Sequence, residues 1–107
     1  MARGSPTVGL PREAILVELR PDQLTFESRK CLLPGTRVLF RLVMEGQPLP
    51  LKLRVTECLV TERDRLGYIY QARFALDGLP EPDRQIINLY IAKGRGSPEL
   101  APWPEDR

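Results

Sequence analysis

The stretch Arg37-Val-Leu-Phe-Arg-Leu-Val-Met44 decides the fold. Its apolar side chains recur at every second position: Val38, Phe40, Leu42 and Met44. Arg37 and Arg41 lie on the other face, and this two-residue period is typical of a β-strand with one buried face. Turn signals enclose the stretch, Pro34-Gly35 before it and Glu45-Gly46-Gln47-Pro48 after it. The segment is therefore predicted to be the central strand of an antiparallel meander.

Four further segments share this alternation and are predicted strands: Ala14–Arg20, Leu24–Glu27, Leu51–Val60 and Tyr68–Leu76. In the first of them, the side chains expected to share one face are Ile15, Val17 and Leu19. In the long segment Leu51–Val60, the charged Glu57 falls on the apolar face. That phase error predicts a β-bulge near Thr56-Glu57. Thr61–Arg65 is predicted to be a charged loop.

One helix is predicted, at Pro82–Lys93. Proline and acidic residues stand at its start and Gly94 follows its end, as helix boundaries prefer. Three turns are not stable alone in water, so its apolar stripe is expected to dock on the sheet. That stripe contains Ile86, Ile87, Tyr90 and Ile91.

The ends of the chain show no periodic pattern. Residues 1–13 are predicted to be a flexible lead-in and residues 94–107 a proline-rich tail, which leaves 14–93 as one domain. Within the tail, Trp103 is a bulky side chain among prolines. It either packs back on its own domain or anchors a partner protein.

Composition excludes several classes. The 107 residues suit a single domain, and 16 basic against 14 acidic residues leave a net charge of +2 without a single-sign block. No apolar run approaches the ~20 residues that span a bilayer, and a cytoplasmic location is expected. Cys31 and Cys58 are predicted to be free thiols in a reducing cytoplasm. A disulfide is the alternative, although nothing in their spacing favours it. The chain has no histidine and no metal-ligand spacing, so neither an enzyme nor a metal or other cofactor is expected.

Together these elements predict a mainly β fold: a small antiparallel barrel of five or six strands with one C-terminal helix. The outline resembles PilZ domains over about residues 14–93. The segments that carry the resemblance are Val17-Glu-Leu-Arg-Pro-Asp-Gln-Leu24, Leu33-Pro-Gly-Thr-Arg-Val38, Ala72-Arg-Phe74 and the Ile86–Ile91 helix.

The resemblance implies a role in bacterial cyclic di-GMP signalling. In that family an RxxxR motif and a [DN]xSxxG motif hold the dinucleotide. Here the second motif falls on Glu18-Leu-Arg20-Pro-Asp-Gln23, with Glu18 at the acidic, Arg20 at the serine and Gln23 at the glycine position. The first motif is absent from its place. Arg37 and Arg41 have its spacing but lie within a predicted strand.

Loss of two forked arginine contacts, each on the order of 1.5–3 kcal/mol, weakens affinity by roughly two to four powers of ten. The sequence therefore predicts a degenerate PilZ-like module that binds cyclic di-GMP weakly or not at all and acts on another bacterial protein. The alternative is a cyclic di-GMP receptor in which Arg12 and Arg20 rebuild the site. A small nucleic-acid-binding barrel is a further alternative. Near-neutral charge counts against it, as does the predicted placement of Tyr68 and Tyr70 in the core or at the barrel rim.

Overall fold

Within residues 6–94 and 96–104, which the computed structural model describes, the chain forms seven strands and one helix. In chain order these are β1 (Thr7–Gly9), β2 (Ile15–Leu19), β3 (Gln23–Ser28), β4 (Arg37–Met44), β5 (Gln47–Asp64), β6 (Gly67–Ala75), α1 (Glu81–Lys93) and β7 (Glu99–Pro102). The predicted mainly β fold with one C-terminal helix is confirmed. The bounds predicted for β4 also hold.

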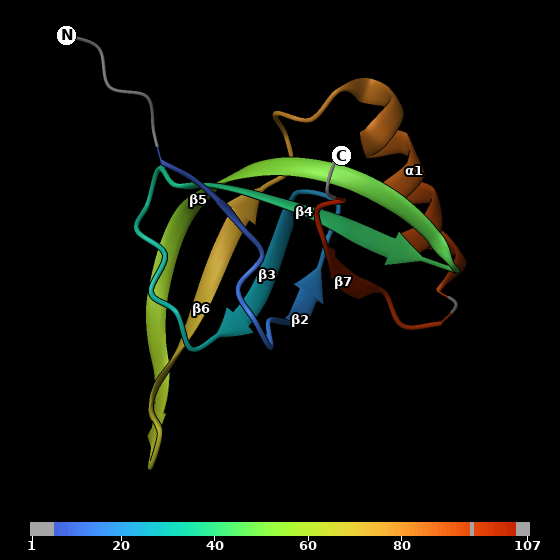
Figure 1. Ribbon diagram of the computed structural model, residues 1–107. Coiled ribbons are helices and arrows are strands. Elements are labelled where there is room, and N and C mark those ends of the chain that lie inside the picture. The colour runs from blue at the N-terminus through green and yellow to red at the C-terminus, as the bar shows by residue number, and fades with distance from the viewer. Residues whose placement is uncertain (1–5, 95, 105–107) are drawn as a thin grey trace, which may run out of the picture.

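The strands form one curled sheet in the order β1-β4-β5-β6-β3-β2, and β7 pairs with β4 beyond the end of β1. All pairings are antiparallel except that of β1 with β4. β5 is the long arc of Figure 1, and it pairs with β4 through its first half and with β6 through its second. The two edges β2 and β7 contact each other without a hydrogen-bonded ladder. The sheet is therefore curled like a barrel with one unpaired seam.

Three phenylalanines from three strands fill the centre of the sheet. Phe26 of β3, Phe40 of β4 and Phe74 of β6 are all fully buried. Their ring centroids lie 5.1 to 6.0 Å apart, and the Phe26–Phe40 pair is edge-to-face. Such pairs add to the hydrophobic stabilisation that burial alone supplies. The aromatic cluster joins the two halves of the sheet on either side of β5.

The predicted bulge in β5 is confirmed, because the register shifts between Val55 and Glu57. Val55 is buried, and after the bulge Glu57 faces outward, where Arg73 Nη1 donates to its carboxylate at 3.0 Å. The extra residue thus removes a charge from the core and returns Cys58 to the inner face. The predicted loop Thr61–Arg65 is wrong in extent, since β5 continues to Asp64.

The β4–β5 connection is shorter than the four residues predicted. Glu45 and Gly46 alone form the turn, both with positive φ (53° and 78°), as a two-residue hairpin turn requires. β5 then begins at Gln47 and includes Pro48 and Pro50. Each proline lacks an N–H, but the first half of β5 pairs on one side only, where prolines are tolerated.

The prediction that Ile15, Val17 and Leu19 share one face of β2 is wrong. Ile15 and Val17 are 64% and 47% exposed, whereas Leu16 and Leu19 pack against the core. A bulge between Leu16 and Glu18 explains the difference, because an extra residue at Val17 lets two leucines three positions apart face inward. Glu18 is then directed to the outer face, opposite Thr25 of β3.

Both chain ends contribute strands that the sequence pattern does not reveal. Residues 7–9 of the predicted lead-in form β1, parallel to the start of β4. Residues 99–102 of the predicted tail form β7, antiparallel to the end of β4. The remaining lead-in residues 1–5 and tail residues 95 and 105–107 lie outside the described residues. β4 therefore has paired neighbours along both of its edges.

Helix α1 lies at the end of the sheet where β4 turns into β5 (Figure 1). It ends as predicted, since Gly94 adopts a left-handed conformation and donates its N–H to the Tyr90 carbonyl at 3.2 Å. Ile87 and Tyr90 are buried. Ile86, predicted to dock on the sheet, is instead 48% exposed. No helix in the described part of the chain is both long and apolar enough to cross a membrane.

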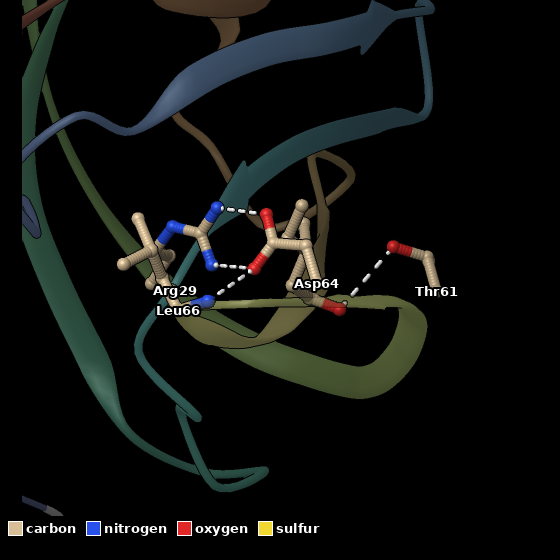
Figure 2. Close-up of polar contacts among 5 residues, drawn as sticks. Arg29, Thr61, Asp64 and Leu66 are labelled. Carbon is tan, nitrogen blue, oxygen red and sulfur yellow. Dashed lines mark hydrogen bonds and ion pairs between the residues drawn. The ribbon is translucent and has the colours of Figure 1, made fainter.

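A bidentate ion pair ties the start of the β3–β4 loop to the end of β5. Nη1 and Nη2 of Arg29 both donate to the Asp64 carboxylate, the first at 2.9 Å (Figure 2). The Leu66 amide donates to the same carboxylate at 3.0 Å. The hydrogen bond from Arg29 is the main reason why the pKa of Asp64 lies below its usual value of 3.8.

This ion pair predicts a pH-dependent stability difference. A carboxyl group with a lowered folded-state pKa stabilises the fold above its unfolded pKa and loses that effect as pH falls through the folded-state value. Asp64→Asn is therefore expected to lower the urea midpoint at neutral pH, and the difference should shrink as pH falls below 3.8. Unfolding titrations between about pH 2.5 and pH 7 measure this. The matched control is Asp77→Asn, and a difference that is constant across the range contradicts the prediction.

Candidate functional site

The motif positions Glu18, Arg20 and Gln23 come together at the β2–β3 turn. Arg20 Nε lies 2.7 Å from one Glu18 carboxylate oxygen. Gln23 Nε2 donates to the other oxygen at 3.4 Å and to Thr25 Oγ1 at 3.3 Å. The backbones of Arg20 and Gln23 close the turn with two hydrogen bonds, of 2.8 and 3.3 Å. One oxygen of the acidic side chain is therefore ion-paired with Arg20, and the other accepts a hydrogen bond from Gln23.

Arg12, the second arginine of the alternative site, lies at the other end of β2. It is exposed, in the turn that precedes Ile15, whereas Glu18 and Arg20 lie at the end of the strand. A strand of five residues is about 17 Å long. The structure therefore brings three of the four sequence-predicted positions together and leaves Arg12 apart from them.

A groove of about 400 Å³ adjoins the motif positions, and we name it the β2 groove. Its lining residues come from β2, the end of α1 and the segment that leads to β7: Leu16 to Leu19, Tyr90, Ile91, Gly94 and Gly96 to Pro98. It thus runs along the unpaired seam. The Tyr90 hydroxyl is buried and has no hydrogen-bond partner among the described residues, which is uncommon for a buried polar atom.

A second groove, of about 360 Å³, lies on the other side of Tyr90, and we name it the hairpin groove. It is formed by α1 and the β4–β5 turn, and its lining residues are Met44, Glu45, Gln47, Pro48, Leu49, Ile86, Leu89, Tyr90 and Lys93. Ile86 and Leu89 are 48% and 63% exposed. Lys93 Nζ lies 4.0 Å from the Glu45 carboxylate at one end of the groove. Most of the lining is apolar, and Glu45 and Lys93 are the charged residues in it.

Trp103, the predicted partner anchor, directly follows β7 and is half-buried. The strand before it is held by Arg41, whose Nε donates to the Pro102 carbonyl at 2.8 Å. The position of Trp103 is therefore set by pairing with β4. This also accounts for Arg41, one member of the RxxxR spacing: its guanidinium fastens a neighbouring strand.

Two features of these grooves escaped prediction. The sequence pattern does not show that Ile86 and Leu89 are exposed, because α1 has apolar residues on more than one face. The face that docks on the sheet cannot be told from the exposed one by spacing alone. The unpartnered Tyr90 hydroxyl depends on what surrounds it, which no local pattern encodes. Within the described residues, His, Cys, Asp and Glu form no group of three or more that could hold a metal ion.

The relation to PilZ domains stays a prediction from the segments quoted above. Its motif residues Glu18, Arg20 and Gln23 are at one turn, and Arg12 is not. Comparison with protein-family models, with curated proteins and with solved structures gives no match for this chain.

Proposed function

We propose that this protein is a PilZ-like regulatory module of bacterial cyclic di-GMP signalling that acts in the cytoplasm by binding another protein, without catalysis. It binds cyclic di-GMP weakly or not at all. The observation that carries this proposal is the closed set of contacts at the β2–β3 turn. Glu18 is ion-paired with Arg20 and accepts a hydrogen bond from Gln23, so a guanine edge has to displace both partners before it can bind there.

The arginine arrangement supports the same proposal. The resemblance implies that two arginines hold the dinucleotide, and guanidinium groups suit phosphates because they bind them with paired hydrogen bonds. Arg20 is directed to Glu18, Arg12 is at the far end of β2, and Arg41 holds β7. None of these guanidinium groups faces another across a common site.

Calorimetry with cyclic di-GMP tests the ligand part of the proposal. The expected result is no saturable heat at micromolar dinucleotide, because the ligand loses roughly two to four powers of ten in affinity without the forked arginines. Arg20→Ala and Arg12→Ala are the matched variants, and both are expected to leave the trace unchanged. A micromolar binding constant that disappears in Arg20→Ala contradicts the proposal and establishes the rebuilt arginine site instead.

For the protein partner, the hairpin groove is the surface we propose. Ile86, Leu89 and Lys93 follow each other at helical spacing on the side of α1 that the sheet does not cover. An apolar helical stripe of this kind is covered well by the apolar stripe of a second helix. Glu45 and Lys93 then pair with charges of either sign. The occupant we propose is an amphipathic helix of a partner protein.

Site-specific photo-crosslinking tests this surface. A photoreactive side chain at position 89 is expected to cross-link a peptide with an amphipathic helical pattern. The same group at Leu66, which is 80% exposed on the β5–β6 turn, is the control and is expected not to. The synthetic peptide should then bind the full chain, and Leu89→Lys should weaken it at least about tenfold, or 1.4 kcal/mol. Equal binding by the variant contradicts the proposed surface.

One observation favours the nucleic-acid-binding alternative. Arg37 of β4 and Arg54 of β5 are directly opposite each other. With Lys52 they line a groove of about 590 Å³. Like charges placed opposite one another repel, and an anion between them relieves the repulsion. A mobility shift with single-stranded oligonucleotides at low salt, lost in Arg37→Ala together with Arg54→Ala, supports this alternative, and no shift ends it.

A further inference from the structure

The two cysteines lie on segments that are fastened to each other at both ends. Residues 29–36 connect β3 to β4 and run along the second half of β5. At the start of this loop, Arg29 pairs with Asp64. At its end, the Gly35 amide donates to the Val55 carbonyl and the Val55 amide donates to the Thr36 carbonyl, each at 2.8 Å. The loop therefore spans β5 between Val55 and Asp64.

The lengths show that this loop runs directly along the strand. Val55 and Asp64 are nine positions apart in β5, which is about 30 Å. Arg29 and Gly35 are six positions apart, at most about 21 Å, and the side chains of Arg29 and Asp64 span the remainder. The loop is therefore nearly fully extended and must stay close to β5 over its whole length. Leu32, in its middle, is 2% exposed.

Cys31 of the loop and Cys58 of β5 are consequently neighbours. The Cys31 thiol and the Leu32 amide both lie close enough to the Cys58 thiol to change its pKa. Cys31 is exposed and Cys58 is half-buried. Burial, together with the neighbouring Cys31, raises the pKa of the Cys58 thiol, and the Leu32 amide opposes this shift. The exposed Cys31 is thus the group that an external reagent reaches first.

We propose that Cys31 and Cys58 form a reversible intramolecular disulfide, with a small disulfide of the glutathione type as oxidant. The Cys31 thiolate attacks one sulfur of the small disulfide and expels one thiolate, which leaves a mixed disulfide on Cys31. Cys58 then loses its proton to solvent, attacks the Cys31 sulfur and expels the second thiolate. The protein loses two electrons and two protons, and the small disulfide leaves as two thiols.

The bond changes the molecule at one place. It joins the β3–β4 loop to β5 covalently, between the two points where hydrogen bonds and the ion pair already hold it. Because the loop is at this position when reduced, oxidation needs little movement of the backbone. The unfolded chain is constrained by the same bond, so the oxidised protein is expected to be more stable than the reduced one.

Mass spectrometry of the full chain in defined mixtures of reduced and oxidised glutathione tests the proposal. The expected product is the monomer lighter by two hydrogen atoms, with a cross-linked peptide pair that contains Cys31 and Cys58. It should revert in excess reduced glutathione and should melt at a higher temperature than the reduced form. Recovery of two free thiols, of a stable glutathione adduct, or of a dimer joined through Cys31 overturns the proposal.

Two single variants assign the order of attack. Cys58→Ser retains Cys31 and is expected to accumulate one glutathione there. Cys31→Ser retains only the half-buried thiol and is expected to react at least about tenfold more slowly. Cys31 is exposed, so Cys31→Ser in its reduced state should melt like the reduced wild type, which shows that slow reaction is not misfolding. Equal rates in the two variants contradict the assigned order.

Discussion

Replacing Phe40 by alanine is expected to lower the free energy of unfolding by about 3 to 5 kcal/mol, the usual range for a fully buried phenylalanine. Phe40 is 0% exposed, and its ring contacts Phe26 and Phe74, so truncation leaves a cavity between rings from three strands. A domain of this size has about 5 to 15 kcal/mol of stability in total. The variant should therefore lose between a fifth and all of that stability.

Urea unfolding followed by circular dichroism measures this loss through the shift of the midpoint. The matched control is Leu66→Ala, because Leu66 is apolar but 80% exposed on the β5–β6 turn. That change is expected to stay within about 0.5 kcal/mol of the wild type. A loss below about 1.5 kcal/mol for Phe40→Ala contradicts the packed aromatic centre.

The second large effect is expected on removal of β7. A chain that ends at residue 97 loses the pairing of Glu99–Pro102 with β4 and the contact of Leu100 with the core. The lost hydrogen bonds and apolar burial correspond to about 2 to 3 kcal/mol. The melting temperature should fall by roughly 10 °C or more. If residues 98–107 were an unstructured tail, their removal would leave the melting temperature unchanged.

A chain that ends at residue 102 is the matched control for Trp103. It keeps β7 and the hydrogen bond from Arg41 to the Pro102 carbonyl but lacks the tryptophan. It is expected to retain most of the stability that the shorter chain loses. If the two truncated chains have the same melting temperature, the stabilisation comes from Trp103 and not from β7.

The sequence predicts the fold best where the pattern is strongest. β4 was predicted with its bounds because four buried side chains alternate without a break. The bulge before Glu57 was predictable because a charge on a buried face has a high energetic cost. The bulge at Val17 was not, since an apolar residue on either face of β2 satisfies the alternation. The free energy of packing decides between the two faces.

The alternation of apolar and polar residues does not predict the shortest strands. β1 and β7 contain three and four residues, too few for a period to be visible. They form because β4 would otherwise have an unpaired edge, and that edge exists only in the assembled sheet. The same holds for the site: the pattern placed Glu18, Arg20 and Gln23 near one turn. It could not show that their side chains would bond to one another, nor that Arg12 would lie at the opposite end of β2.

Pairing of both β1 and β7 with β4 has a consequence for biosynthesis. The first strand contacts residues about thirty positions later, and the last strand contacts residues about sixty positions earlier. During translation at about 5 to 20 residues per second, β4 emerges from the ribosome while half of its second edge is still unmade. The nascent domain thus exposes unpaired backbone N–H and C=O groups on β4 for several seconds. A chaperone is expected to bind the chain during this interval.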